Sequence, residues 1–334
     1  MRTCDAWRAS TPSSVFLLLL MPSAVAAAFV PGSSGAQFAA GIRELQDLMI
    51  GQAKAADPAA AWTVDEHSRG CACIVEEGDI WEKGCISVTL IEDGTLSAQR
   101  AAAISARTGS GIAEGAKYSA CALSFVLHAR SPLVPTLRGD VRVFAVADEE
   151  WYGGGIDLTP SYVEAEDCTY FHTALAELCA QHAEPTTYRQ MKATCDDYFY
   201  IPCRGEHRGV GGVFFDDETA AWAPTFCDAL MRCALDDDGP YMPLVRKRLP
   251  LEYTDAQKQW QLLRRGRYIE FNLLYDRGVK FGLTPESVER VLVSSPPMVA
   301  FKYRVSAEQP EGSPEARTLD VLRKPRDWLA AAKP

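Results

Sequence analysis

Three groups of residues in this chain have types and spacings that could support chemistry. Cys71 and Cys73 form a Cys-x-Cys pair, and cysteine thiolates are ligands for soft metals. Residues 109–115 read Gly-Ser-Gly-Ile-Ala-Glu-Gly, which is close to the glycine pattern of a dinucleotide-binding loop. Basic side chains gather at 246–248 and at 264–267, and arginine binds carboxylates through a two-point fork. The candidate chemistries are therefore metal binding, nucleotide binding and the binding of small anions.

The metal and nucleotide patterns are both incomplete. Glu114 stands where the dinucleotide loop needs its third glycine, and the chain lacks the Walker A, His-Glu-x-x-His and Gly-x-Ser-x-Gly motifs. The eleven cysteines are odd in number, and no second close pair lies at zinc-finger spacing. We therefore expect a reduced compartment, no disulfide framework and no metal site. Metal binding through Cys71, Cys73 and Cys203 is the alternative that stoichiometric zinc in the purified protein would support.

The overall charge limits the class of partner. Acidic residues outnumber basic ones by 44 to 34, which gives a formal net charge of −10 at neutral pH. Surfaces that bind nucleic acid cluster Lys and Arg instead, so we expect no nucleic-acid partner. A local arginine cluster can still bind a small anionic substrate. The composition is that of a globular protein, and no stretch of the 334 residues reads as a domain linker.

The apolar periodicity predicts a mixture of helices and strands. Strands are expected in neighbouring runs, with helices between the groups rather than after every strand, which indicates an α+β fold with a largely antiparallel sheet. The triple glycine at 153–155 interrupts the pattern and is expected to mark a sharp turn or a close backbone approach. The expected strands are 71–75, 86–91, 118–128, 141–146, 210–215, 268–274 and 298–303. The expected helices are 41–49, 97–106, 164–182, 185–196, 222–233, 254–264 and 285–292.

The first 40 residues differ from everything after them. Arg2 and Arg8 precede the apolar run 15–21, and mostly small residues follow at 24–28, as in a signal peptide with its cleavage site. The apolar run is too short to span a membrane. Because a Gly/Ser/Ala-rich segment opens at Phe29, we predict a two-part plastid presequence over 1–40, with plain secretion as the alternative. The mature domain would cover 41–334 and would not span a membrane.

Three later segments carry distinctive motifs: 151–162 (Trp-Tyr-Gly-Gly-Gly-Ile-Asp-Leu-Thr-Pro-Ser-Tyr), 195–217 (from Cys-Asp-Asp-Tyr to Phe-Phe-Asp-Asp) and 267–283 (Arg-Tyr-Ile-Glu-Phe-Asn-Leu-Leu-Tyr-Asp-Arg-Gly-Val-Lys-Phe-Gly-Leu). In this order they closely resemble the oxygen-dependent coproporphyrinogen III oxidases. Shorter matches lie at 78–84 and at 325–328, so the resemblance covers roughly residues 41–330. It implies a single domain built on a large antiparallel sheet with helices on both faces, and a homodimer formed through the segment around 268–303.

The family's reaction removes carbon dioxide oxidatively from two propionates of coproporphyrinogen III and yields protoporphyrinogen IX for heme and chlorophyll. It uses molecular oxygen as co-substrate and needs no cofactor. Such a site requires cations for the propionates. It also requires carboxylates that accept hydrogen bonds from pyrrole N–H groups and stabilise positive charge developing on the ring.

The resemblance places candidate site residues at seven positions. Asp157 and Asp276 would be the pyrrole-facing carboxylates. The structural alternative for Asp157 is capping of the two residues that follow it, and the alternative for Asp276 is a surface turn. His128 matches a family histidine, and we count it with the two aspartates as catalytic. Asn272, Asp216 and Asp217 also lie in the motifs, where a structural role is equally compatible. The residues expected to bind substrate are Ser124, Arg138, Arg142 and Arg277.

The chain departs from the family pattern at the proton donor. The family reads Pro-Thr-x-His-x-Asn-x-Arg, whereas residues 135–142 read Pro-Thr-Leu-Arg-Gly-Asp-Val-Arg. Arg138 thus replaces the histidine, and Asp140 replaces the asparagine. Arginine cannot release a proton at neutral pH, whereas histidine titrates there. Arg138 can therefore hold a propionate but cannot be the general acid, which leaves His128, water or the substrate.

Two further departures leave two interpretations open. Residues 284–287 lack the arginine that the family carries there and present Glu286 instead, and Cys203 replaces a histidine proposed as a metal ligand in some members, although His172 remains. We predict a working oxidase, because Asp157, Asp276, Arg142 and Arg277 are intact and the loss of one general acid slows an enzyme by about a hundred- to ten-thousand-fold rather than abolishing its activity. The alternative is a catalytically impaired paralogue that binds a tetrapyrrole or pairs with an active relative.

Overall fold

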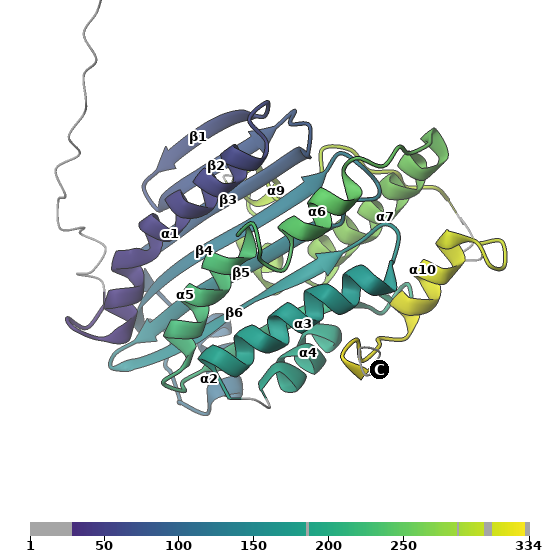
Figure 1. Ribbon diagram of the computed structural model, residues 1–334. Helices are drawn as coiled ribbons and strands as arrows, with labels where there is room; N and C mark the ends of the chain where they lie inside the picture. The colour runs from purple at the N-terminus through teal and green to yellow at the C-terminus, as the bar shows by residue number, and fades with distance from the viewer. Residues whose placement is uncertain (1–28, 185–186, 286, 304–308, 331–334) are drawn as a thin grey trace, which may run out of the picture.

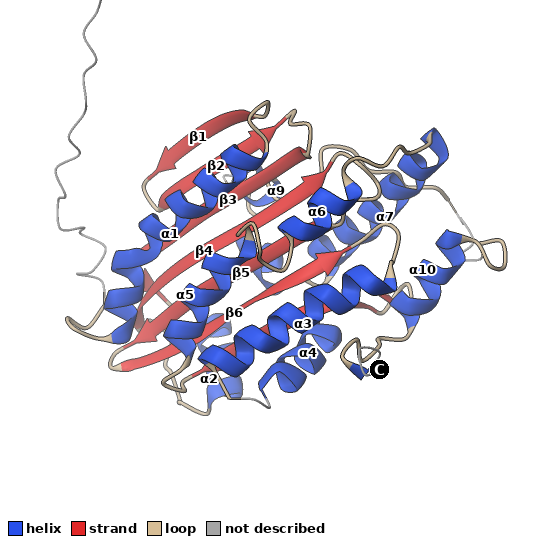
Figure 2. Ribbon diagram, in the orientation of Figure 1, coloured by secondary structure: helices blue, strands red, loops and turns tan. Residues whose placement is uncertain are grey.

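The computed structural model describes residues 29–184, 187–285, 287–303 and 309–330. Seven strands form one sheet in the order β1-β2-β3-β4-β5-β6-β9, and every neighbouring pair is antiparallel (Figure 2). A second, two-stranded sheet pairs β7 with β8. The α+β class and the antiparallel sheet are thus confirmed. The strands are β1 Ala61–His67, β2 Gly70–Glu76, β3 Trp81–Thr95, β4 Lys117–Ala129, β5 Thr136–Val146, β6 Glu149–Thr159, β7 Tyr200–Ile201, β8 Glu206–His207 and β9 Gly211–Glu218.

Helices cover both faces of the large sheet, as predicted. In Figure 1, α1, α3, α5 and α6 lie in front of the strands, and α7 and α9 lie behind them. α4 packs along β9 at the edge of the sheet. The helices are α1 Ser34–Ala56, α2 Ala98–Thr108, α3 Ala165–His182, α4 Thr187–Tyr198, α5 Ala223–Ala234, α6 Met242–Arg248, α7 Asp255–Leu274, α8 Arg277–Gly282, α9 Val288–Leu292 and α10 Pro314–Arg323.

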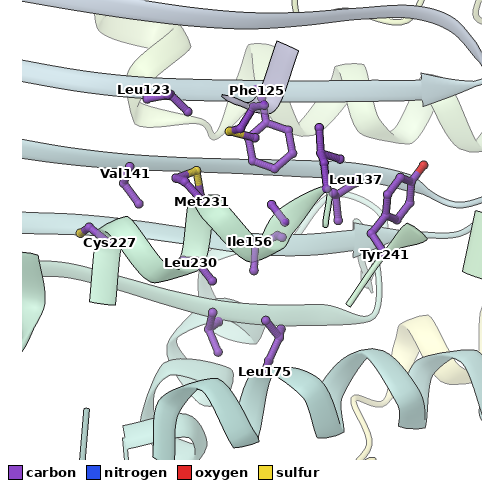
Figure 3. Packing of buried hydrophobic residues seen from close by; sticks show 14 of the residues in the cluster. Leu123, Phe125, Leu137, Val141, Ile156, Leu175, Cys227, Leu230, Met231 and Tyr241 are labelled. Carbon is purple, nitrogen blue, oxygen red and sulfur yellow. The ribbon is translucent and has the colours of Figure 1, made fainter. Parts of the chain in front are cut away.

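The main hydrophobic core lies between the sheet and the front helices. Successive side chains of a strand point to opposite faces, so β5 turns Leu137, Val141 and Val143 to this side. In Figure 3, Leu137 and Val141 lie on the same side of the strands as Leu230 of α5 and Leu175 of α3. We call this the apolar face.

The other side of the same strands is polar. The residues of β5 that alternate with the core side chains are Arg138, Asp140 and Arg142. A smaller aromatic cluster covers part of this side, with Phe199 following α4, Phe214 on β9 and Phe271 on α7. We call this the polar face. It is the side on which a site for an anion can form.

The helix expected at 254–264 and the strand expected at 268–274 are one helix, α7, so the strand prediction is wrong. Trp260, Arg264, Tyr268 and Phe271 are buried along it at spacings of four, four and three residues, which is the period of a helix face. Gly266 lies inside α7, where an added Cβ would come 2.8 Å from the carbonyl oxygen of Ala300. The glycine therefore permits close packing of the later chain instead of ending the helix.

The strand expected at 298–303 is also absent from the structure of those residues. Met298, Phe301 and Tyr303 are exposed there, and the amide of Ala300 donates to the carbonyl of Leu262 in α7 at 2.9 Å. Without a neighbouring strand, the apolar run cannot form a ladder. Conversely, β1 was not expected, because its mostly exposed residues give no apolar alternation.

The triple glycine does not mark a turn, because it lies in the middle of β6. A Cβ at Gly155 would come 2.3 Å from the carbonyl of Val213, and one at Gly154 would come 2.5 Å from the carbonyl of Asp140. The predicted close backbone approach is thus confirmed, and the predicted sharp turn is wrong. Both neighbouring strands lie too near for any larger residue.

The N-terminal part of the described chain is packed against the domain. Phe29 is buried, and Ser33 caps α1, which begins at Ser34. The predicted presequence boundary at residue 40 therefore falls within α1, and residues 1–28 lie outside the described residues. Within the described residues, no helix is long and apolar enough to cross a membrane.

Candidate functional site

The polar face brings together charged residues from β5, β9 and the start of α8. Arg138, Asp140 and Arg142 follow one another at every second position of β5, so their side chains share a side. Ser124 on β4 lies directly opposite Asp140 in the sheet register, is exposed, and lies 3.1 Å from Ser87 between hydroxyl oxygens. The sequence-predicted Ser124 and the two arginines are therefore side by side on an accessible part of the sheet.

Ion pairs join these residues into a continuous row. Arg142 contacts Asp140 through Nη1 and donates to Asp216 on β9 through Nη2 at 2.9 Å. The other carboxylate oxygen of Asp216 accepts from Nη2 of Arg277 at 3.0 Å. Arg138 lies 3.7 Å from Asp140 and 3.5 Å from Asp276, measured from guanidinium nitrogen to carboxylate oxygen. We call these six residues the charge row: Asp276, Arg138, Asp140, Arg142, Asp216 and Arg277.

The two ends of the row differ in accessibility. The side chain of Arg277 is 41% exposed, whereas that of Asp276 is 5% exposed. Asp276 caps α8, since its Oδ1 accepts from the amide of Val279 at 3.0 Å. Its Oδ2 faces Arg138. One buried carboxylate thus both caps α8 and faces the charge row, whereas the structural alternative considered for Asp276 was a surface turn.

The pKa values of three members of the charge row, Asp216, Arg138 and Arg142, are shifted in the direction that favours their charged forms. Burial would raise the pKa of Asp216, but the charges of Arg142 and Arg277 outweigh it and lower that pKa. Burial would likewise lower the pKa of Arg138, yet the carboxylates of Asp276 and Asp140 raise it. Asp216, Arg138 and Arg142 are thus charged at neutral pH, and the row provides ion pairs rather than exchangeable protons.

Two arginines of the charge row lie against aromatic rings. The guanidinium of Arg142 lies over Phe214 at 5.7 Å, and that of Arg277 lies over Tyr198 at 5.0 Å. Tyr198 and Phe214 are stacked on each other, with centroids 4.6 Å apart. The cation–π contacts orient the two arginines without using their N–H groups.

A glycine makes room for Arg142 on the neighbouring strand. Gly153 of β6 is the register partner of Arg142, and a Cβ there would come 2.8 Å from Nη2 of that arginine. The guanidinium can therefore lie close against β6 and reach Asp216 on the strand beyond. This is a second function for the glycine motif, besides the approach of the strands.

Asp157 lies beside the charge row but has a buried partner of its own. It is the register partner of Arg138, and both of its oxygens accept from Nη2 of Arg208, at 2.8 and 2.7 Å. The Arg208 side chain is fully buried, and its guanidinium lies over Phe199 at 3.9 Å and over Tyr268 at 4.9 Å. Asp157 thus lies next to the charge row, with Arg208 as its own partner.

His128 lies under α9 rather than in the open part of the site. Its Nε2 lies 2.9 Å from the carbonyl of Ser294, and its Nδ1 lies 3.4 Å from the hydroxyl of Thr136. Burial lowers its pKa to about 3, and the charge of Arg265 adds to that effect. At neutral pH the ring is therefore neutral, with Nε2–H as the donor.

Sequence reasoning missed Arg208 altogether and left Asp216 open between two roles. Both lie in the segment 195–217, but the contacts that define them come from distant elements: Arg208 meets Asp157 of β6, and Asp216 meets Arg142 of β5 and Arg277 of α8. The signal that could have identified these two residues is the need of each buried charge for a partner of opposite sign. Glu286, which the chain presents in place of a family arginine, lies outside the described residues.

The cysteines considered for metal binding lie apart from the charge row. Within the described residues, no group of three or more His, Cys, Asp or Glu side chains could hold a metal ion. Cys71 and Cys73 are buried on β2 with sulfur atoms 3.8 Å apart, and Cys203 is exposed in the β7–β8 turn. His172 is buried, between the hydroxyl of Tyr188 and the carbonyl of Val210.

Comparison with known proteins gives consistent matches. Residues 37–328 match the family model described as coproporphyrinogen III oxidase. The chain is 41% identical over 287 residues to a protein of Mus musculus named oxygen-dependent coproporphyrinogen-III oxidase, mitochondrial, and the match covers 82% of this chain and 64% of that protein. It is 37% identical over 314 residues to a Glycine max protein of the same name but chloroplastic, covering 88% and 79%. The matched region spans less than two thirds of the length of the mouse protein and of its human counterpart.

Proposed function

The chain belongs to the coproporphyrinogen III oxidase family, and we propose that it converts coproporphyrinogen III to protoporphyrinogen IX by oxygen-dependent oxidative decarboxylation. The charge row carries this proposal. It supplies three arginines on the same face of the sheet as the exposed Ser124. Arginine forks recognise carboxylates, and coproporphyrinogen III carries four propionates.

The proposed reaction needs positioned charges more than it needs a resident cofactor. Each reacting propionate loses its carboxylate carbon as carbon dioxide, and the carbon attached to the pyrrole ring loses one hydrogen together with two electrons, which leaves a vinyl group. Molecular oxygen accepts these two electrons, that hydrogen and one proton from water or the substrate, and becomes hydrogen peroxide. The electrons come from the electron-rich tetrapyrrole, so the protein's task is to hold the propionates and stabilise positive charge on the ring.

The roles of the site residues follow from their exposure. Arg277 is the most accessible cation of the row and would take the first propionate. Arg142 and Arg138, which face Asp140 from both sides, would hold a second one. Asp276 would accept a hydrogen bond from a pyrrole N–H through its Oδ2, because its Oδ1 already caps α8. Asp157 would contribute its negative charge from beneath the ring while paired with Arg208.

Protons in this scheme would come from water or from the substrate. Arg138 cannot supply one, and His128 is neutral and fully occupied by Ser294 and Thr136. For His128 to take part, the carbonyl of Ser294 would have to leave its Nε2–H. The predicted catalytic role of His128 therefore depends on movement of the chain around α9.

We further propose a homodimer formed through 268–303 and import into plastids. This segment contains several exposed apolar residues, and subunit interfaces commonly bury such side chains. They are Leu273, Leu274, Leu283, Met298 and Phe301. The Glycine max relative is named chloroplastic and the mouse relative mitochondrial, so the two names point to different organelles. The plastid assignment rests on the presequence pattern.

Turnover of coproporphyrinogen III tests the proposal directly. We expect the full chain to form protoporphyrinogen IX in air and none under argon, followed as fluorescence after oxidation to the porphyrin. Arg277→Ala should lower kcat/KM by about a hundredfold, the order expected when one aligned charge is removed from a reacting site. Arg232→Ala is the matched control, because Arg232 forms an exposed ion pair on α5. Tight porphyrin binding without any turnover would contradict the enzyme and support the impaired paralogue.

A further inference from the structure

Asp140 differs from the other two aspartates of the charge row. Asp276 caps α8, and Asp216 joins β5 to α8 while also accepting from the amide of Asp217. Within the described residues, the carboxylate of Asp140 contacts only Arg138 and Arg142. It therefore holds no element of the fold in place, and its interactions concern only the cations of the site.

The position of Asp140 is that of a carboxylate between two arginine forks. Its Oδ1 lies 3.7 Å from Nη1 of Arg138, and its Oδ2 contacts Nη1 of Arg142. The side chain is 14% exposed and lies opposite Ser124, at the open part of the polar face. A propionate bound by the same two arginines would need this location.

Asp140 also removes the net charge of the site. Arg138, Arg142 and Arg277 carry three positive charges, and Asp140, Asp216 and Asp276 carry three negative charges. The adjoining pair of Arg208 and Asp157 is neutral as well. A tetra-anionic ligand therefore meets no net positive field, although such a field is what concentrates anions at a binding site.

We propose that Asp140 is a specificity-determining residue, an internal carboxylate that occupies the Arg138–Arg142 pair and must be displaced by a substrate propionate. This inference rests on the proposed tetrapyrrole site and says how that site selects. Displacement costs affinity for every ligand that places a carboxylate there. The natural chain therefore discriminates only weakly between porphyrins with four and with two carboxylates, and the asparagine that the family pattern carries would restore discrimination.

Porphyrin binding to Asp140→Asn tests the inference. The substitution removes one charge and keeps the size, so the two guanidinium groups become available. We expect the Kd for coproporphyrin III to fall about tenfold or more, which corresponds to about 1.4 kcal/mol. The Kd for a porphyrin with two carboxylates should fall less. Asp140→Glu keeps the charge and should bind like the natural chain, while Asp140→Ser is a second neutral variant if the asparagine protein does not fold.

Asp217→Asn is the matched control. Asp217 is paired with Arg107 rather than with the charge row, and its φ of 53° is a conformation that asparagine tolerates well. The Asp217→Asn variant should bind porphyrin with the same affinity as the natural chain. If Asp140→Asn and Asp217→Asn bind alike, or if Asp140→Asn binds more weakly, the role of Asp140 is refuted while the proposed function stands. If neither the natural chain nor any variant binds coproporphyrin III, the tetrapyrrole site itself is refuted.

Discussion

The two faces of the large sheet use the same strands for different purposes. On the apolar face, Leu137, Val141 and Val143 of β5 pack under α5, where burial of carbon stabilises the fold. On the polar face, Arg138 and Arg142 of the same strand meet carboxylates from β9 and from the α7–α8 junction. Losing an apolar contact leaves a cavity, whereas losing an ionic partner leaves a buried charge. The two faces therefore respond to mutation by different mechanisms, and only the polar face should change binding.

Removal of Arg208 should show the largest effect on the polar face. Asp157 would remain 3% exposed without its partner, and breaking a buried ion pair from one side typically costs about 3–5 kcal/mol. We expect Arg208→Ala to lower the free energy of unfolding by that amount and to abolish porphyrin binding, as measured by denaturant titration and fluorescence quenching. Leu230→Ala on the apolar face should cost about 2–5 kcal/mol yet leave binding unchanged in the folded protein. Loss of binding in both variants would erase the distinction between the faces.

The pH dependence of stability should sharpen the comparison next. The folded state keeps the pKa of His128 at about 3, so its ring stays neutral while the unfolded chain takes up a proton below pH 6.5. Stability is therefore full above that pH and falls as the pH drops toward 3. Between pH 7 and 5, His128 should account for a loss of about 2 kcal/mol.

A His128→Gln variant isolates this contribution. Glutamine can still donate to the carbonyl of Ser294 but does not titrate, so its unfolding free energy should fall by about 2 kcal/mol less over the same pH range. His172, whose pKa burial also lowers to about 3, is present in both proteins and cancels from the difference. Equal pH slopes in urea titrations would show that His128 is not held neutral.

Gly153→Ala should have the smallest effect on stability. The added Cβ would press on the guanidinium of Arg142, which is the far end of a flexible side chain, so we expect a loss of about 1 kcal/mol or less. Displacing Arg142 should nevertheless weaken coproporphyrin III binding about tenfold in the same quenching assay. Gly51→Ala is the control, because nothing lies within 4 Å of its added Cβ on α1, and it should stabilise that helix by up to about 1 kcal/mol without altering binding. Unchanged binding by Gly153→Ala would mean that Arg142 does not contact the ligand.

The sequence by itself determined most of the sheet. Two-residue alternation in 118–128 and 141–146 predicted strands that the structure contains as β4 and β5. β5 begins earlier than predicted, at Thr136, and this extension puts Arg138 and Asp140 on the same side as Arg142. The motif resemblance predicted Asp157, Asp276 and Arg277 as site residues, and the structure brings them close to Arg138 and Arg142. Such local patterns are readable because the backbone period fixes which side chains share a face.

Only the tertiary structure decided which charges meet. The pairing of Asp157 with Arg208 joins residues 51 positions apart, and that of Arg142 with Asp216 joins residues 74 positions apart. No local period relates such residues, because strand order and helix docking set their distance. The same applies to α7, where apolar residues that suit a strand became a helix because their burial against the polar face follows a spacing of three and four. The chemistry of this protein therefore depends on long-range packing, while its elements are largely local.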